Sequence, residues 1–231
     1  MPILRIATYN LHRGIGFDGQ YDPARIVDVA RELDADILAF QEVSDRAPIE
    51  GMLDLHATLH GIRGYQAVSG PNVNDGTERY GNVLLCRPPI VRSANLDIGV
   101  RGFEPRGAIV AEITIGARLV VVVATHLGLR RAERRSQYGM LEDAVAPFQA
   151  RGIPVLFMGD FNSWLPDEKD LKRLGAGSAS RTPATFPAPV PFLALDRIWA
   201  VPDIVRRRRA PGSGGARWAS DHRPLAAELT V

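Results

Sequence analysis

Several short apolar segments of this chain end directly in side chains of the kind that bind metal ions or phosphate. Four of them, each with the polar residues that follow it, are Ile3–Tyr9 with Asn10, Asp36–Phe40 with Gln41 and Glu42, Leu119–Thr125 with His126, and Ile153–Met158 with Gly159–Asn162. Near the C-terminus, Leu195 precedes Asp196, and Ser220–His222 precedes a last apolar segment. One such ending would be chance, but six predict one site at a common edge of a β core. Its carboxylates and histidines suit metal-assisted cleavage of a phosphate ester.

The composition is that of a globular protein without a strong charge bias. The chain has 231 residues, of which 45% are hydrophobic and 23% charged, so we expect a single domain over residues 1–231. The net charge of +2 is too small to indicate a nucleic-acid partner. All basic residues except Lys169 and Lys172 are arginines, whose planar side chain grips phosphate in two places. An arginine-rich genome explains this preference at least as well.

Cys86 is the only cysteine, which excludes an intramolecular disulfide and a cysteine-based zinc cluster. The chain begins with Met1–Ile6, which is typical of a strand and not of a basic, apolar leader peptide. No apolar run approaches the ~20 residues that a spanning helix needs. We therefore expect a soluble, cytoplasmic and monomeric protein, with loose attachment to a membrane surface left open.

The spacing of apolar residues predicts many short strands and a few helices. The predicted helices are Asp22–Leu33, Ile49–His60 and Arg131–Phe148. Asp22 is a good N-cap, Pro23 suits the first helical turn, and Gly116-Ala117 predicts a hairpin turn. The predicted strands are Ile3–Tyr9, Asp36–Gln41, Tyr65–Ser69, Asn82–Cys86, Ile90–Ile98, Ala108–Ile115, Arg118–Thr125, Ile153–Met158, Leu195–Val201, Arg217–Ser220 and Leu225–Thr230. This mixture indicates an α+β fold or layered sandwich and not a regular βαβ sheet.

Three further segments are predicted to be loops. Gly70–Arg79 is polar, and Gly175–Pro191 is long and rich in Ala, Pro, Ser and Gly. Loops of such length inside a compact domain often shape a substrate site, so we expect these two to decide substrate choice. Arg206–Arg209 is a block of four arginines that either attracts a phosphate-rich surface or forms a solvated loop.

The motifs at the strand ends follow one another as they do in a known superfamily. They are Thr8–Gly14 with Gln41–Val43, Tyr80–Arg87, Thr125–Leu127, Gly159–Asn162, Leu195–Ile198 and Ser220–Pro224. Their order resembles that of the endonuclease/exonuclease/phosphatase, or DNase I-like, superfamily. The chain as a whole resembles small bacterial members of this superfamily. The resemblance runs from residue 3 to residue 230. It implies a four-layer α/β/β/α sandwich in which two mixed, mainly antiparallel sheets pack face to face with helices outside.

A phosphodiester is anionic and resists attack by water, so its cleavage needs a positioned nucleophile and neutralisation of charge. Glu42 stands at a strand end, and a carboxylate is a natural ligand for Mg²⁺, which prefers oxygen. Asn10 can hold the same ion, or its water, through the amide oxygen. In the family the matching Glu and Asn hold Mg²⁺ or Mn²⁺, and Asp221 resembles a further carboxylate on the metal side.

The resemblance also implies roles around the phosphate. Asp160 is expected to orient or deprotonate the attacking water, and Asn162 to donate to the phosphate in the transition state. His222 is expected to contact the phosphate, while Asp196 fixes its orientation and favours the imidazolium.

His126 is a second histidine expected to face the phosphate, either as a contact or as an acid for the leaving group. Asn82 and Arg106 match family positions near the phosphate and are secondary candidates. His12 departs from the pattern, because several nucleases of the family carry another polar residue there. This departure predicts a different arrangement beside the metal.

Taken singly, these candidates have ordinary structural explanations. A lone Glu42 would most often be a surface charge, Asp221 would begin a turn, and a lone His126 would be a hydrogen-bonded structural histidine. Their joint occurrence favours the site. His56 and His60 face each other at helical spacing and are interpreted as an ordinary helix face. Arginines after His126 either contact an anionic substrate or form a solvated face beside Glu133; they are Arg130, Arg131, Arg134 and Arg135.

The sequence therefore predicts a Mg²⁺- or Mn²⁺-dependent phosphodiesterase that acts through an activated water. Nucleic acid and a phospholipid or other small phosphodiester remain alternative substrates. Two other activities are a phosphate monoesterase and a non-catalytic phosphate-binding module on the same fold. The intact set of candidate residues argues against a module that has lost its reaction.

Overall fold

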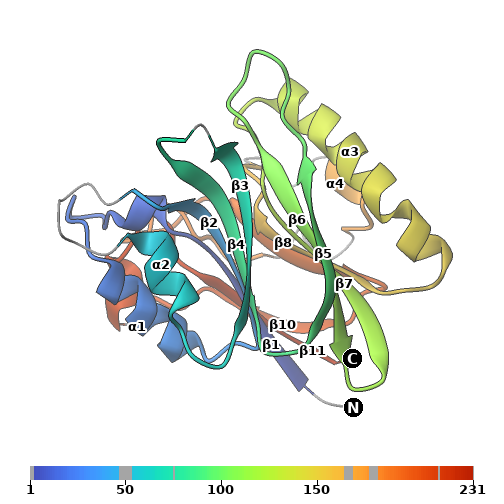
Figure 1. Ribbon diagram of the computed structural model, residues 1–231, viewed down its shortest axis with the longest axis horizontal. Coiled ribbons are helices and arrows are strands. Elements are labelled where there is room, and N and C mark those ends of the chain that lie inside the picture. Colours follow the sequence, from blue (N-terminus) through green and yellow to red (C-terminus); the bar gives the residue numbers. More distant parts are fainter. Residues whose placement is uncertain are drawn as a thin grey trace.

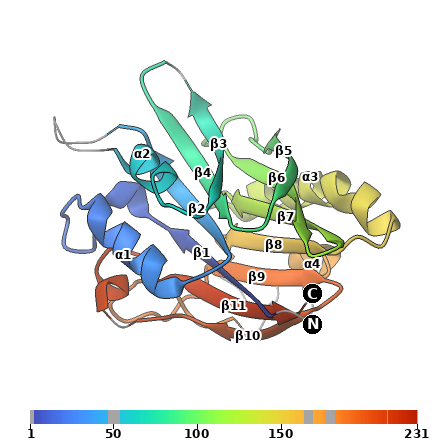
Figure 2. The ribbon, with the colours of Figure 1, turned by 60° about the horizontal axis from the view of Figure 1, so that its bottom comes forward.

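The chain forms two β-sheets that pack face to face, with helices on their outer faces (Figures 1 and 2). The computed structural model describes residues 3–46, 54–74, 76–163, 169–176, 182–212 and 214–230. One sheet has the strand order β10-β11-β1-β2-β4-β3 and the other β5-β6-β7-β8-β9. The four-layer sandwich expected from the sequence is thereby confirmed.

Each sheet is mainly antiparallel and contains one parallel pair, β1 with β2 and β7 with β8. The strands of the first sheet are β1 (Ile3–Asn10), β2 (Ile37–Ser44), β3 (Gln66–Asn74), β4 (Arg79–Cys86), β10 (Val205–Arg209) and β11 (Leu225–Thr230). The strands of the second sheet are β5 (Ile90–Asp97), β6 (Gly107–Ile115), β7 (Arg118–His126), β8 (Val155–Asp160) and β9 (Asp196–Val201).

Alternating side chains on the strands fill three hydrophobic layers. In β1, Leu4 and Ile6 point into the layer between the two sheets, whereas Ala7 and Tyr9 point to the outer face that the helices cover. The strand period of two residues produces this division. Full burial of a side chain such as Ile6 stabilises the fold by roughly 1.5–3 kcal/mol. The sheets therefore hold each other in register through their shared layer.

The helices lie outside this sandwich and begin where local sequence favours them. They are α1 (Pro23–Leu33), α2 (Leu55–His60), α3 (Arg131–Ala150) and α4 (Lys169–Arg173), with the 3-10 turns η1 (His12–Gly14) and η3 (Gly214–Arg217). The Asp22 side chain caps α1 by accepting the backbone N–H groups of Ala24 and Arg25 at 3.0 and 3.3 Å. Among the described residues, no helix combines the length and the apolar character that crossing a bilayer requires.

The strand pairing brings the polar strand ends to one end of the sandwich. Asn10 lies opposite Gln41 across the parallel β1–β2 pair. In the second sheet, Asp160 lies beside His126 of β7 on one side and Asp196 of β9 on the other. Parallel neighbours end at the same edge of a sheet, so these residues gather without any long-range adjustment.

Three sequence predictions were wrong in part. The loop predicted from Gly70 is strand as far as Asn74, because β3 pairs with β4 through a bulge that accommodates Pro71. Arg206–Arg209 is strand and not loop, since β10 pairs with β11 at the edge of the sheet, where charged side chains can face solvent. The strand predicted over Arg217–Ser220 is instead a turn, in which Trp218 and Ala219 both donate to the Gly215 carbonyl.

Two other predicted segments extend beyond the described residues. The helix predicted near Ile49–His60 is helical over Leu55–His60, and its first part falls on residues 47–53, outside the described ranges. The Gly175–Pro191 loop includes residues 177–181, which are also outside them.

Gly159 is expected to be essential for the close approach of β8 to β7. Its φ is +150°, and an added Cβ would lie 1.9 Å from the Thr125 carbonyl oxygen. We predict that Gly159→Ala lowers the free energy of unfolding by about 2–4 kcal/mol, measured by urea denaturation. Gly139→Ala is the matched control, because a Cβ there meets nothing within 4 Å and alanine favours the surrounding helix. Equal stability of the two variants would contradict this account.

Candidate active site

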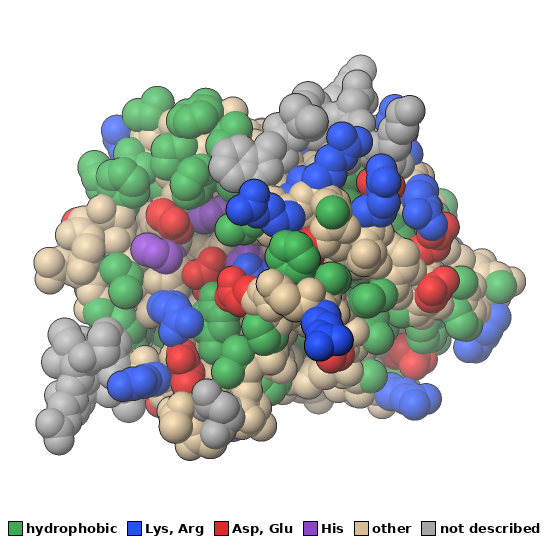
Figure 3. Space-filling model, turned by 90° about the horizontal axis from the view of Figure 1, so that it is seen from above, with side chains coloured by type: hydrophobic (Ala, Val, Ile, Leu, Met, Phe, Trp, Pro, Cys, Tyr) green, Lys and Arg blue, Asp and Glu red, His purple; other side chains and the backbone are tan. Residues whose placement is uncertain are grey.

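A cleft of about 350 Å³ opens at the end of the sandwich where the polar strand ends meet. Figure 3 looks onto this end and shows histidine and acidic side chains close together, with basic and hydrophobic ones around them. Side chains from both sheets line it: Asn10, Arg13, Glu42, Tyr80, Glu104, Arg106, His126, Leu129, Asp160, Asn162, Phe186, Leu195 and His222. Six of the residues predicted from the sequence are therefore close neighbours in one cavity, together with the secondary candidate Arg106.

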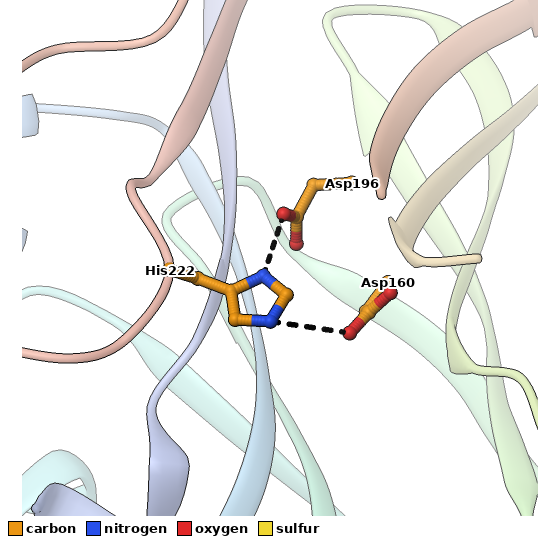
Figure 4. Close-up of side chains that lie close together, drawn as sticks. All are labelled: Asp160, Asp196 and His222. Atoms are coloured by element: carbon orange, nitrogen blue, oxygen red, sulfur yellow. Dashed lines mark hydrogen bonds and ion pairs between the residues drawn. The ribbon is translucent and has the colours of Figure 1, made fainter. Parts of the chain in front are cut away.

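His222 and Asp196 form a buried ion pair at the floor of this site (Figure 4). The His222 Nδ1 atom lies 2.9 Å from Asp196 Oδ2, and the same oxygen accepts a hydrogen bond from the Thr185 hydroxyl at 2.5 Å. Phe186 covers the imidazole ring, with 4.9 Å between ring centroids. The carboxylate fixes the ring so that Nε2 points toward Asp160.

The charge around His222 favours its protonated form. Burial is the largest single influence and would lower the pKa of this histidine, but the charge and hydrogen bond of Asp196, together with the charges of Asp160 and Asp221, outweigh it. Together they raise the pKa of His222 to about 10. At neutral pH the side chain is therefore an imidazolium whose Nε2–H is available to an anionic group in the cleft.

Asp160 stands at the centre of the site and is 1% exposed. Its Oδ1 accepts the backbone N–H of Asn162 at 2.9 Å, and its Oδ2 accepts the Asn10 amide at 3.1 Å. The same Oδ2 lies 3.8 Å from His222 Nε2 and 3.6 Å from His126 Nε2. A carboxylate between two histidines is well placed to receive or direct a proton.

His126 has the opposite protonation preference from His222. Burial lowers the pKa of His126 to about 3; Asp160 opposes this shift, and Arg106 and His222 add to it. The Asn162 amide donates to the Leu127 carbonyl at 2.9 Å and lies 3.2 Å from His126 Nε2. His126 is thus a neutral imidazole in the free protein.

Glu42 presents a half-buried carboxylate to the cleft from a strained backbone. Its φ is +57°, and the β2–β4 register shifts between Phe40 and Val43, so the side chain leaves the regular alternation of the strand. The Asn10 amide nitrogen donates to Glu42 Oε1 at 3.0 Å. Asn10 therefore links the carboxylates of Glu42 and Asp160 through one NH₂ group.

The Asn10 amide is oriented by its own backbone neighbour. The backbone N–H of His12 donates to Asn10 Oδ1 at 3.1 Å, which directs the nitrogen of the amide toward the two carboxylates. The amide oxygen expected to face a metal ion is thus engaged elsewhere. The His12 side chain contacts the backbone, with its Nδ1 atom 3.2 Å from the Ile15 carbonyl oxygen.

Two places in the site have ligand atoms that suit a divalent cation, a group of three side chains and the single carboxylate of Glu42. One is Asp160, Asp196 and His222, whose ligand atoms lie within 4.8 Å of one another. An imidazolium has no free lone pair on nitrogen, and Asp196 Oδ2 already serves two donors, so this set is built to hold a proton. The Glu42 carboxylate, with its oxygen atoms and partial exposure, fits Mg²⁺ or Mn²⁺, which keep several water ligands.

The remaining candidates lie around the cleft. Arg106 is buried, lines the cleft and pairs with Glu104 at 2.7 Å. Asn82 does not line it; its amide donates to the Gly107 carbonyl at 2.9 Å and so fixes the strand beside Arg106. Asp221 also lies outside the lining, where its carboxylate accepts from the Ser220 hydroxyl at 3.3 Å.

The arginines after His126 divide into different roles. Arg134 is buried, and its guanidinium donates to the carbonyl groups of Gly128 and Leu129. It therefore fastens the loop behind His126 and does not face substrate. Arg135 lies 3.6 Å from Asp170, whereas Arg130 and Arg131 are exposed.

His56 and His60 are stacked on each other, with ring centroids 4.2 Å apart, away from the cleft. Both Nε2 atoms lie within hydrogen-bonding distance of the Ser69 hydroxyl, at 2.7 and 3.0 Å. The helix face predicted from their spacing therefore packs on β3.

Several residues of the site were not predicted. Thr185 reaches Asp196 from a loop whose composition gives no signal for such a contact. Arg13 stacks its guanidinium 4.1 Å from the Tyr80 ring centroid at the mouth of the cleft, and Phe186 covers His222. Arg13 and Tyr80 lie inside motifs that the sequence had singled out, so their positions were available as a signal.

The fold and the cleft together define a DNase I-like sandwich with its polar site at one end of the two sheets. A sequence model described as the Endonuclease/Exonuclease/phosphatase family matches residues 7–222. The chain belongs to this family, whose members are generally metal-dependent phosphoesterases and nucleases.

Relatives and solved structures agree with this assignment. A protein of Escherichia coli (strain K12) described as "Uncharacterized protein YbhP" is 30% identical over 242 residues, covering 97% of this chain and 95% of its own length. An endonuclease/exonuclease/phosphatase from Bacteroides vulgatus shares the fold with a TM-score of 0.80 at 18% identity, covering 100% of both chains. Truncated TDP2 of Caenorhabditis elegans gives a TM-score of 0.75 at 20% identity, covering 99% of this chain and 98% of its own.

The opposite protonation of the two histidines is directly measurable. We predict that, in metal-free protein at neutral pH, His222 is an imidazolium and His126 a neutral imidazole, seen as distinct ¹⁵N shifts in long-range ¹H–¹⁵N spectra. The charge of His222 should be lost only as pH rises toward about 10. Assignment uses His222→Gln and His126→Gln, and His56→Gln removes a histidine that lies away from the site. Titration of His222 near the ordinary histidine value would contradict the electrostatic account.

Proposed function

We propose that this protein hydrolyses phosphodiester bonds by attack of a water molecule activated at Asp160, with a divalent cation, Mg²⁺ or Mn²⁺, held at Glu42. The observation that carries the proposal is the placement of one buried carboxylate between a protonated and a neutral histidine, linked to a second carboxylate through Asn10. Family membership supports the same chemistry.

In this mechanism Asp160 accepts a proton from water or aligns it for attack on phosphorus. Asn162 fixes Asp160 through its backbone N–H, and its side-chain amide is near enough to His126 to donate to a phosphate oxygen there. His222 offers its Nε2–H to another phosphate oxygen, and Asp196 holds that proton in place. Arg106, buried at the cleft wall, adds a fixed positive charge.

His126 is better suited to contact the phosphate than to begin as an acid. A group with a pKa of about 3 carries no proton at neutral pH, so it has none to give a leaving group in the free protein. An anionic phosphate bound beside it would favour the protonated imidazole. The alternative role, as acid for the leaving group, therefore requires substrate binding first.

Glu42 would hold the cation, and Asp221 is the further carboxylate proposed on that side. Asn10 would serve the metal site through its amide nitrogen, which fixes Glu42 and Asp160, because its oxygen is engaged by His12. When bound, the cation would neutralise charge on the phosphate and on the leaving oxygen.

The substrate is proposed to be a phosphodiester, either nucleic acid or a phospholipid or other small diester, acted on by a cytoplasmic monomer. A phosphate monoesterase is the alternative activity on the same residues. A phosphate-binding module without turnover is the alternative class of function. The polar side chains gathered at this site, most of them buried, argue against the last, because such a set stabilises a fold less well than apolar packing would.

Hydrolysis of bis-p-nitrophenyl phosphate with Mg²⁺ or Mn²⁺ tests the proposal. Asp160→Asn is predicted to lower turnover by about 10²- to 10⁴-fold with the fold intact, and EDTA should abolish it. Asp143→Asn on the exposed face of α3 is the matched control and should keep full activity. Full activity of Asp160→Asn would overturn the site assignment, and hydrolysis of p-nitrophenyl phosphate alone would favour the monoesterase.

A further inference from the structure

The exposed hydrophobic side chains are concentrated at the end of the sandwich that carries the cleft. Of the nine large exposed hydrophobic residues in the described part of the chain, six lie in loops at this end. They are Phe17, Phe103, Leu129, Val190, Phe192 and Trp218. The remaining three, Ile3, Val91 and Met140, lie at the opposite strand ends or on α3. Figure 3 shows hydrophobic side chains gathered beside the histidines, most densely on one side.

The densest part of this surface is built from three loops that are fastened together. Phe17 donates its backbone N–H to the Trp218 carbonyl, and their ring centroids lie 6.3 Å apart. Ala188 donates to the Asp221 carbonyl at 2.7 Å. Phe192 donates to the Phe186 carbonyl at 2.9 Å within a small hairpin. The exposed tips therefore project from a fixed backbone.

Val190 and Phe192 are the most exposed of these side chains, at 70% and 72%. On the other wall of the cleft, Leu129 is 60% exposed, and the Arg134 guanidinium holds its carbonyl at 2.8 Å. Apolar side chains that are exposed to water on both sides of a polar cleft do not stabilise the fold. Such a gathering marks a surface that another apolar phase covers.

Arginines accompany these tips without acidic partners. The carboxylates on the same loops are engaged, since Asp18 pairs with Arg25, Glu104 pairs with Arg106, and Asp97 accepts the Gly99 N–H. Next to the tips along the chain, four exposed arginines have no carboxylate partner within the described ranges: Arg101, Arg130, Arg131 and Arg217. They flank the tips in sequence, and Arg217 also lies over the Trp218 ring at 5.4 Å. The rim of the cleft is thus apolar and positively charged together.

We propose that this end of the protein docks on a bilayer of anionic phospholipid. The apolar tips enter the boundary between head groups and acyl chains, the free arginines meet lipid phosphates, and the cleft then faces the head groups. Tryptophan with arginine at the rim suits this boundary. This surface binds whether or not the cleft hydrolyses anything, so docking does not depend on the proposed function.

A nucleic-acid strand would fit this surface less well. Stacking of bases requires flat side chains along a track, and although four of the six tips are aromatic, Val190 and Leu129 are aliphatic and offer no π face. The four arginines come from three separate segments, namely the β5–β6 loop, the start of α3 and the end of η3, so no single segment offers a continuous path for a phosphate backbone. A lipid surface does not require the arginines to form a continuous path.

The test measures sedimentation of the full chain, in EDTA, with vesicles of phosphatidylglycerol mixed with phosphatidylcholine, and with vesicles of phosphatidylcholine alone. We expect binding to the anionic vesicles that weakens with salt. The double variant Val190→Ser/Phe192→Ser should bind about tenfold more weakly or worse. The matched control is Ile3→Ser/Val91→Ser, which removes two side chains of similar exposure, 67% and 62%, from the opposite end and should bind as wild type.

Arg101→Gln/Arg131→Gln should lose the preference for anionic vesicles while keeping the fold, seen as an unchanged melting temperature. Absence of wild-type binding, or equal loss in the loop variant and its control, would overturn the proposal. Tighter binding to a single-stranded oligonucleotide than to vesicles would overturn it in favour of base stacking. Hydrolysis of soluble bis-p-nitrophenyl phosphate should be the same in the loop variant and wild type. If vesicles bind but no diester is cleaved, docking stands and the proposed function falls.

Discussion

The burial of the Asp160 carboxylate is the constraint on which the rest of the site depends. A charge taken out of water is costly unless donors and counter-charge replace its hydration. Here the Asn10 amide and the Asn162 backbone donate to it, and the His222 imidazolium stands nearby. Each of these partners comes from a different strand end, so the carboxylate is satisfied only when both sheets are packed in register. Folding and assembly of the site are therefore one event.

The site is also where the backbone departs from regular geometry. Of the five non-glycine residues with positive φ in the described part of the chain, Arg13, Glu42 and Asn162 line the cleft. Such conformations cost of order 1–3 kcal/mol each and persist only where the surroundings fix them. The bulge in β2 turns Glu42 out of the strand and toward the cleft, which a regular strand would not do. The strained backbone therefore directs the Glu42 carboxylate toward the place where a cation would lie.

Local sequence patterns predict much of the fold and of the candidate site. The start of α1 follows from Asp22 and Pro23 alone, and polar residues directly after apolar runs are visible without knowledge of the fold. The contact of Thr185 with Asp196 depends on how the loop over Gly175–Pro191 folds back, which no local pattern encodes. Likewise, β10 forms because its backbone pairs with β11, and this pairing is independent of the arginine side chains.

In the proposed mechanism the cation lies at Glu42, whereas Asp160, Asp196 and His222 serve the proton and the phosphate. The most direct test is a crystal structure of the protein with Mn²⁺ and inorganic phosphate, with the metal located by anomalous scattering. The predicted result is a Mn²⁺ peak about 2.1 Å from a Glu42 carboxylate oxygen, with a phosphate oxygen in hydrogen-bonding distance of His222 Nε2. A Mn²⁺ peak coordinated by Asp160, Asp196 and His222 would contradict the account, because that arrangement would leave no protonated histidine to meet the substrate.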